Sequence, residues 1–104
     1  MTPETPPLPP VPASRPPLAP HEVRRRRLLY RATHRGTHEN DLLIGGYVGR
    51  HIATMDEAAM DALEAVMALP DPDLADWLSG RLPIPPEHDG PLLRAMRAEA
   101  GRPA

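Results

Sequence analysis

The chain has no cysteine among its 104 residues, and its 12 basic residues are all arginine. Without cysteine, disulfides, thiolate zinc sites and thiol catalysis are excluded, and the composition fits a reducing compartment. Long apolar runs are missing too, since stretches such as Leu42–Ile44 fall far short of the roughly 20 residues that cross a bilayer. We therefore expect no redox chemistry by the chain itself and no membrane insertion.

The charges are divided along the chain. Residues 21–50 carry seven arginines against three acids, a net charge of +4, whereas residues 51–90 carry nine acids against one arginine, a net charge of −8. Such a separation can orient an encounter with a charged partner, although the total is only −2.

Proline dominates the beginning of the sequence, where it occupies nine of the first twenty positions. We expect residues 1–20 to form a disordered or polyproline II tail, residues 21–100 to form the domain, and residues 101–104 to be a disordered C-terminus. The tail lacks the apolar core of a signal peptide and the arginines of a transit peptide, which favours a bacterial cytoplasm.

Apolar residues from position 21 onward recur at helical spacing, and no segment alternates with the period of a strand. Helices are expected from His21 to the interruption at Gly36, over about 37–51, from Thr54 to the stop at Pro70, over 71–78 with Gly80 ending it, and over about 91–99. The sequence therefore predicts an all-α protein, a small five-helix bundle.

The pattern also predicts details of these helices. Val23, Arg27, Leu28 and Tyr30–Ala32 are expected to form the amphipathic pattern of the first helix, and Leu42, Leu43, Tyr47 and Val48 one face of the second. Gly45, Gly46 and Gly49 weaken that second helix but let a neighbour approach closely. Thr54 and Glu57 form a candidate capping box, followed by Met55, Ala59, Leu63, Val66 and Met67 facing the core.

Residues able to carry catalysis are few. Ser14 and Ser79 have no hydrolase signature around them, and Glu39 and Asp41 are two apart, hence on different sides of a helix. His34 and His38 have a metal-compatible spacing, but a glycine lies between them and no third ligand is assured. We expect no enzymatic activity and no metal site.

Four consecutive arginines, Arg24–Arg27, suggest an alternative function as a small helical nucleic-acid-binding regulator of the antitoxin kind. Consecutive helical residues point about 100° apart, so these arginines do not form a single stripe. The acidic second half would also repel a polyanion. A solvated helix end or an acid-facing docking surface is favoured over nucleic-acid binding.

Residues 35–41 combine Arg35, Gly36, Glu39 and Asp41 where two helices are expected to meet. Arginine offers a planar fork to a carboxylate or phosphate, and glycine permits a close backbone approach. Alternatively, Arg35 and Glu39 simply pair with each other and Gly36 only makes the turn. The residue chemistry alone leaves a docking site and a helix junction equally open.

The motif Arg35-Gly36-x-x-Glu39-x-Asp41, followed by Leu42-x-Ile44 and later by Asp71-Pro72-Asp73-Leu74-x-x-Trp77-Leu78, resembles the succinate dehydrogenase assembly factors that promote flavinylation of the flavoprotein subunit. The resemblance covers roughly residues 27–97, and the two blocks lie about as far apart as in that family. The Arg-Gly-x-x-Glu motif alone is weak, but the pair of blocks is fairly specific.

The resemblance implies a five-helix assembly factor that binds the flavoprotein subunit of succinate dehydrogenase or fumarate reductase and assists covalent attachment of FAD to a histidine there. FAD would belong to the partner, with none bound stably by this chain, which is expected to be monomeric when unbound. Arg35, Gly36, Glu39 and Asp41 match the partner-binding motif and its acidic neighbour, whereas Asp73, Leu74 and Trp77 match a block assigned to folding.

Overall fold

The computed structural model describes residues 18–100 of the chain. Its five α-helices are α1 (Pro20–Thr33), α2 (His38–His51), α3 (Glu57–Met67), α4 (Asp71–Ser79) and α5 (Pro91–Glu99). Two 3₁₀ turns, η1 (Ile52–Thr54) and η2 (Pro86–His88), precede α3 and α5. The all-α, five-helix prediction is confirmed for this part of the chain, while residues 1–17 of the expected tail and the C-terminal residues 101–104 lie outside the described residues.

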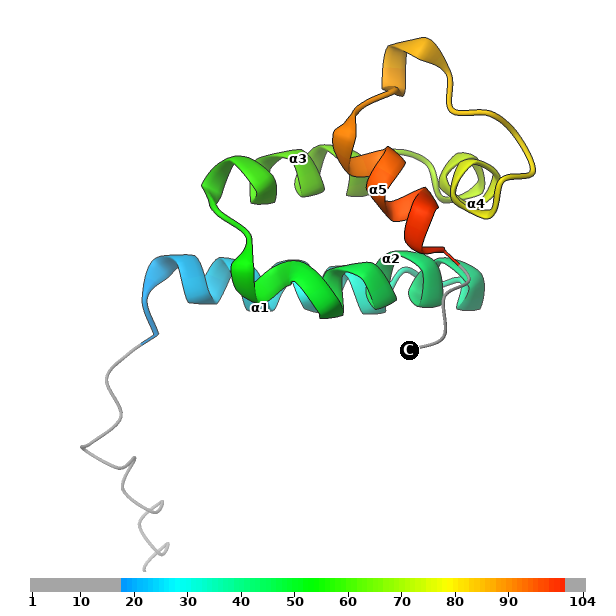
Figure 1. Cartoon of the computed structure of the whole chain (residues 1–104). Helices are drawn as coiled ribbons and strands as arrows, with labels where there is room; N and C mark the ends of the chain where they lie inside the picture. Colours follow the sequence, from blue (N-terminus) through cyan, green and yellow to red (C-terminus); the bar gives the residue numbers. More distant parts are fainter. Residues whose placement is uncertain (1–17, 101–104) are drawn as a thin grey trace, which may run out of the picture.

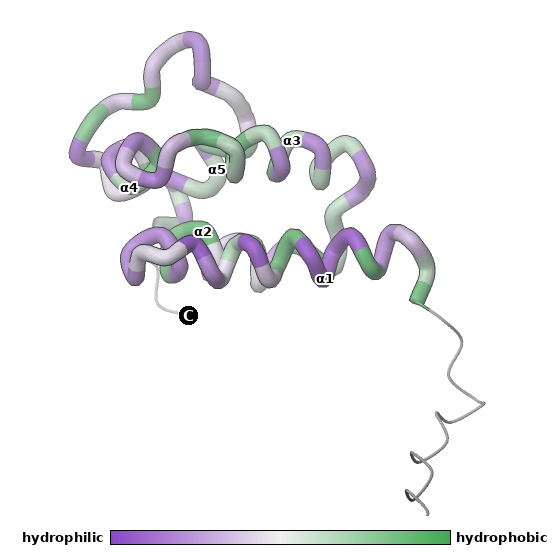
Figure 2. The backbone as a smooth tube through the Cα atoms, turned by 180° about the vertical axis from the view of Figure 1, so that it is seen from behind, coloured by the Kyte–Doolittle hydropathy of each residue, from purple (hydrophilic) through white to green (hydrophobic). Residues whose placement is uncertain are grey.

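The helices form two layers. In Figure 1, α1 and α2 run side by side in one layer, and α3, α4 and α5 lie across its inner face. The tube in Figure 2 is largely hydrophilic along α1, where only Leu28 and Ala32 are buried. Since α1 has few apolar residues, we attribute its stability mainly to packing on α2 and α3.

A single core lies between the layers and draws on every α-helix. Its buried apolar members are Leu28, Ala32, Ile44, Tyr47, Val48, Ile52, Met55, Met60, Leu63, Val66, Met67, Leu74, Trp77, Leu78, Leu93 and Met96.

The expected apolar faces of α1 and α2 were partly wrong. Tyr30 and Leu42 are 64% and 61% exposed, whereas Ile44 and Asn40 are fully buried. Leu42 precedes Ile44 by two residues, which places it about 200° around the helix, on the side away from the core. Pairwise apolar spacing in the sequence did not reveal which side the second layer would cover.

Gly45 explains how closely the two helices of the first layer pack. A Cβ built on Gly45 would lie 2.9 Å from the Thr33 Cγ2 atom and 3.1 Å from the Ala32 carbonyl oxygen. The expected close approach is therefore confirmed at this glycine. It is not found at Gly49, where the position of a Cβ has no neighbouring atom within 4 Å.

The start of α3 corrects another prediction. Asp56, not Thr54, is the N-cap, and its carboxylate accepts a hydrogen bond of 2.8 Å from the Ala59 backbone N–H. Thr54 lies in η1 and donates to the His51 carbonyl oxygen. On α3, Met60 is fully buried, while Ala59, which was expected to face the core, is only partly buried.

The predictions for the second layer are confirmed in outline. Leu74, Trp77 and Leu78 are buried on α4, and Gly80 ends that helix with a φ of 82°, a left-handed conformation that glycine adopts without strain. The α5 bounds agree with the prediction.

Candidate functional site

The candidate site is the junction between α1 and α2. Thr33, the last residue of α1, donates its hydroxyl proton to the Leu29 carbonyl oxygen, and the Thr37 hydroxyl accepts from the Asn40 backbone N–H as the N-cap of α2. Between them Gly36 has a φ of 92°, which disfavours any residue with a Cβ. Gly36 is exposed, and a Cβ placed there would have no atom within 4 Å.

Arg35 is turned into the protein, its side chain only 10% exposed. Its Nε and NH2 lie 2.9 Å from the Asp71 Oδ1, and its NH1 donates to the Met67 carbonyl oxygen at 2.8 Å. Met67 ends α3 and Asp71 begins α4, so the guanidinium satisfies a free carbonyl at one helix end and a carboxylate at the next. Arg35 thus connects the α1–α2 junction to the α3–α4 junction.

Two neighbours complete this connection. The Asp41 carboxylate accepts a 2.6 Å hydrogen bond from the Arg35 backbone N–H, which holds the turn against the first turn of α2. The buried Asn40 side chain donates from Nδ2 to the backbone oxygen of Asp71 at 2.8 Å and to its Oδ1 at 3.1 Å. Asn40 and Asp71 were absent from the predicted site, although an asparagine one turn before Ile44 on a core-facing helix was a usable signal.

Glu39 has the opposite orientation and is exposed. Its two carboxylate oxygens accept hydrogen bonds from Arg81 NH1 and NH2, at 2.8 and 3.2 Å, while Arg81 Nε donates to Asp76 at 3.0 Å. The bonds to Glu39, and then that to Asp76, raise the pKa of Arg81 above its usual value. The Arg35–Glu39 pairing considered from the sequence is therefore not formed, since each residue has another partner.

The four predicted site residues thus divide into two pairs. Arg35 and Asp41 are partly buried and directed toward other parts of the junction, whereas Gly36 and Glu39 lie exposed on its surface. We infer that the first pair keeps the turn in place and that the second pair is what another molecule can reach.

The metal and nucleic-acid alternatives gain no support from the geometry. Within residues 18–100 no group of three potential ligands is close enough to hold a metal, and His34 stacks on Tyr30 with ring centroids 4.0 Å apart. Arg24 pairs with the three α3 acids Glu57, Asp61 and Glu64, at 2.6, 2.6 and 3.2 Å. Arg25 donates to the Met55 carbonyl oxygen. Half of the arginine run therefore holds α1 to the rest of the bundle.

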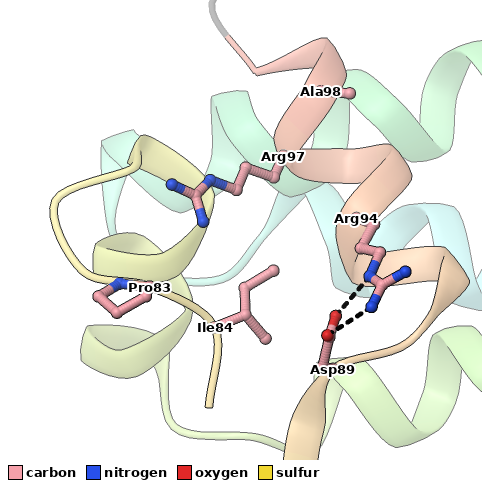
Figure 3. A pocket seen from close by; sticks show the side chains of 6 residues that line it. All are labelled: Pro83, Ile84, Asp89, Arg94, Arg97 and Ala98. Atoms are coloured by element: carbon pink, nitrogen blue, oxygen red, sulfur yellow. Dashed lines mark hydrogen bonds and ion pairs between the residues drawn. The ribbon is translucent and has the colours of Figure 1, made fainter. Parts of the chain in front are cut away.

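An open hollow lies between the 83–90 loop and α5. Its volume is about 530 Å³, and Figure 3 shows the six side chains that line it. On its rim Arg94 donates from Nε and NH2 to the two carboxylate oxygens of Asp89, both at 2.6 Å. These bonds lower the pKa of Asp89 and raise that of Arg94.

No helix among the described residues is long and apolar enough to span a membrane.

The fold and the junction are those of a small five-helix protein in which an Arg-Gly-x-x-Glu turn joins the first pair of helices. Residues 26–100 match the family described as flavinator of succinate dehydrogenase. The chain belongs to this family.

Individual relatives agree with this assignment. The chain is 52% identical over 74 residues to "FAD assembly factor SdhE" of Acetobacter pasteurianus, covering 71% of this chain and 68% of that protein. It is 30% identical over 76 residues to the mitochondrial succinate dehydrogenase assembly factor 2 of Dictyostelium discoideum, covering 73% of this chain and 54% of the relative. Against the Arabidopsis thaliana protein of that name the identity is 42% over 65 residues, 60% of this chain and 35% of the relative. The chain thus spans about half or less of these two mitochondrial relatives.

Proposed function

We propose that this chain is a non-catalytic assembly factor that binds the flavoprotein subunit of succinate dehydrogenase, or of fumarate reductase, and promotes covalent attachment of FAD to that subunit. FAD and the histidine that receives it belong to the partner, and this chain holds no FAD stably. It acts in the bacterial cytoplasm, as a monomer when unbound. Membership of the flavinator family is the observation that carries the proposal.

The junction supports a docking role through its rigidity. Arg35 and Asp41 hold the turn in one conformation before any partner arrives, so little conformational entropy is lost on binding. Gly36 lets a partner backbone approach closely because no side chain covers it. Glu39, three residues later, places an exposed carboxylate in the first turn of α2.

The function is tested by deleting the gene in its host and measuring covalent flavin fluorescence on the denatured flavoprotein subunit. We expect the fluorescence to fall and to return when the wild-type gene is restored. Undiminished fluorescence in the deletion strain would refute the proposal.

The docking site is tested with Gly36→Arg and its matched control Gly36→Ala. Both variants force a residue with a Cβ into the left-handed conformation, at a cost of about 1–2 kcal/mol, so both lose similar stability. Only arginine adds bulk on the exposed side. We expect Gly36→Arg to abolish binding of the purified flavoprotein subunit while Gly36→Ala binds within a fewfold of wild type, measured beside the melting temperature of each. Equal binding by both variants would remove Gly36 from the interface.

A further inference from the structure

Arg81 lies outside the Arg-Gly-x-x-Glu motif but contacts it through Glu39. It follows Gly80, whose left-handed conformation ends α4, and the Leu82 backbone N–H returns to the Asp76 carbonyl oxygen at 3.0 Å. This reversal of the chain brings Arg81 to the first turn of α2, 42 residues away in sequence from Glu39. The side chains of Arg81 and Glu39 are 52% and 44% exposed, so the pair lies on the surface.

Arg81 donates a hydrogen bond to each of the two oxygens of Glu39. A partner that covers Glu39 must therefore either displace Arg81 with a cation of its own or bury the existing pair intact. Displacement is disfavoured because Asp76 also holds Arg81, at 3.0 Å. A displaced guanidinium would stay beside the incoming cation, and two like charges in a partly dehydrated interface repel each other.

Burying the intact pair is the less costly route. A carboxylate that already accepts two hydrogen bonds from an arginine keeps these bonds when an interface covers it, and they offset the cost of losing water. An isolated carboxylate would lose its water without any replacement. Arginine has five N–H donors, and three of those of Arg81 are used by Glu39 and Asp76. Two donors remain, on opposite sides of the guanidinium, for acceptor oxygens on another molecule.

Resting on the proposed function, we propose that Arg81 is a partner-binding residue. It keeps Glu39 paired when the flavoprotein subunit docks, and it donates from its remaining N–H groups to carboxylate or carbonyl oxygens of that subunit. Glu39 and Arg81 then act as one unit, and the interface extends from the α1–α2 junction to the end of α4.

The test measures the dissociation constant of the full chain with the purified flavoprotein subunit. The variants are Arg81→Gln, Arg81→Lys, Glu39→Gln and the double variant Glu39→Gln/Arg81→Gln. The matched control is Arg94→Gln, because Arg94 is also exposed and also makes two hydrogen bonds to one carboxylate, but beside the hollow of Figure 3 and not at the junction. Melting temperatures of all variants are compared with that of Arg94→Gln.

We expect Arg81→Gln to weaken binding by about tenfold, the scale of one or two charge-assisted hydrogen bonds, and Arg94→Gln to change it by less than about twofold. Arg81→Lys should recover part of the loss, because it restores the charge without the fork. The double variant should bind little worse than Arg81→Gln alone, since the two residues act together.

Three outcomes overturn the inference. Tighter binding by Arg81→Gln would mean that Arg81 competes with the partner for Glu39. Unchanged binding would place Arg81 outside the interface. Fully multiplicative losses in the double variant would show that the two residues act separately. If the wild-type chain does not bind the flavoprotein subunit, both this inference and the proposed function fail. If Gly36→Arg loses binding but the Arg81 variants do not, the proposed function stands and only the role of Arg81 is refuted.

Discussion

Asp71→Ala is the change that most directly tests how the junction is held. Two guanidinium nitrogens of Arg35 lie 2.9 Å from the Asp71 carboxylate, which also accepts a hydrogen bond of 3.1 Å from the Asn40 side-chain amide. Its removal leaves the charge of Arg35, a side chain only 10% exposed, with the Met67 carbonyl oxygen as its remaining hydrogen-bond acceptor. The contacts of Asn40 and Asp41 with neighbouring backbone groups would persist.

The size of the effect follows from the burial of the pair. Breaking a fully buried ion pair by removing one partner costs about 3–5 kcal/mol. The Asp71 side chain is 29% exposed, so water can reach the vacated site, and we expect a loss of about 2–3 kcal/mol. For a domain of this size the total stability is of order 4–12 kcal/mol, and the melting temperature should fall by roughly 10–20 °C.

The control is Asp73→Ala. Asp73 is exposed in the same first turn of α4 and shares the favourable interaction with the helix dipole, worth about 0.3–1 kcal/mol, but it makes no hydrogen bond to Arg35. Urea unfolding followed by circular dichroism gives both free energies. A double variant with Arg35→Met should restore part of the loss, because it removes the charge left without its partner. If the losses of unfolding free energy in Asp71→Ala and Asp73→Ala agree within about 0.5 kcal/mol, Arg35 does not hold the junction through Asp71.

Three further changes are predicted from the described contacts. Gly45→Ala should destabilise the protein by about 1–3 kcal/mol because its Cβ would meet Thr33. Gly49→Ala, with open space around its Cβ, should stabilise the protein by about 0.5–1 kcal/mol. Thermal melts check this, since the melting temperature should fall in the first variant and rise in the second. Hydrogen bonding to His51 lowers the pKa of Glu99 in the folded protein. The stabilising contribution of the Glu99 carboxylate is therefore present above the unfolded pKa of about 4.3 and is lost as the pH falls through the lower folded pKa. The melting-temperature deficit of Glu99→Gln should therefore shrink as the pH falls toward 3, and a deficit independent of pH would contradict this assignment.

Much of the helical framework could be read from local signals. Proline and glycine mark the boundaries: Pro20 and Pro91 open α1 and α5, and Gly36 and Gly80 occupy left-handed turns that follow helices. The errors arose where a local signal had two readings. Thr54 and Asp56 are both good capping residues, and the choice depended on the 3₁₀ turn that the chain makes before α3.

The candidate site was located by its motif, but the roles within it were not. Arg35 and Glu39 stand four apart and invite a local pair, yet each has a partner from the second half of the chain. Asp71 and Arg81 lie 36 and 42 residues away from them, at the two ends of α4. No periodicity or spacing reports such contacts, because they arise only when α4 packs across the first layer.

Residue type, short-range spacing and a recognisable pair of motif blocks therefore predicted most of the helices, the residues that end them and the family. Which charged groups of the junction are used internally, and which remain on its surface, depends on how α4 packs on α2. An arginine pairs with a carboxylate that the fold brings within hydrogen-bond distance. For Arg35 that carboxylate is Asp71, partly buried in the first turn of α4, and for Glu39 the matching cation is Arg81, on the surface just after α4.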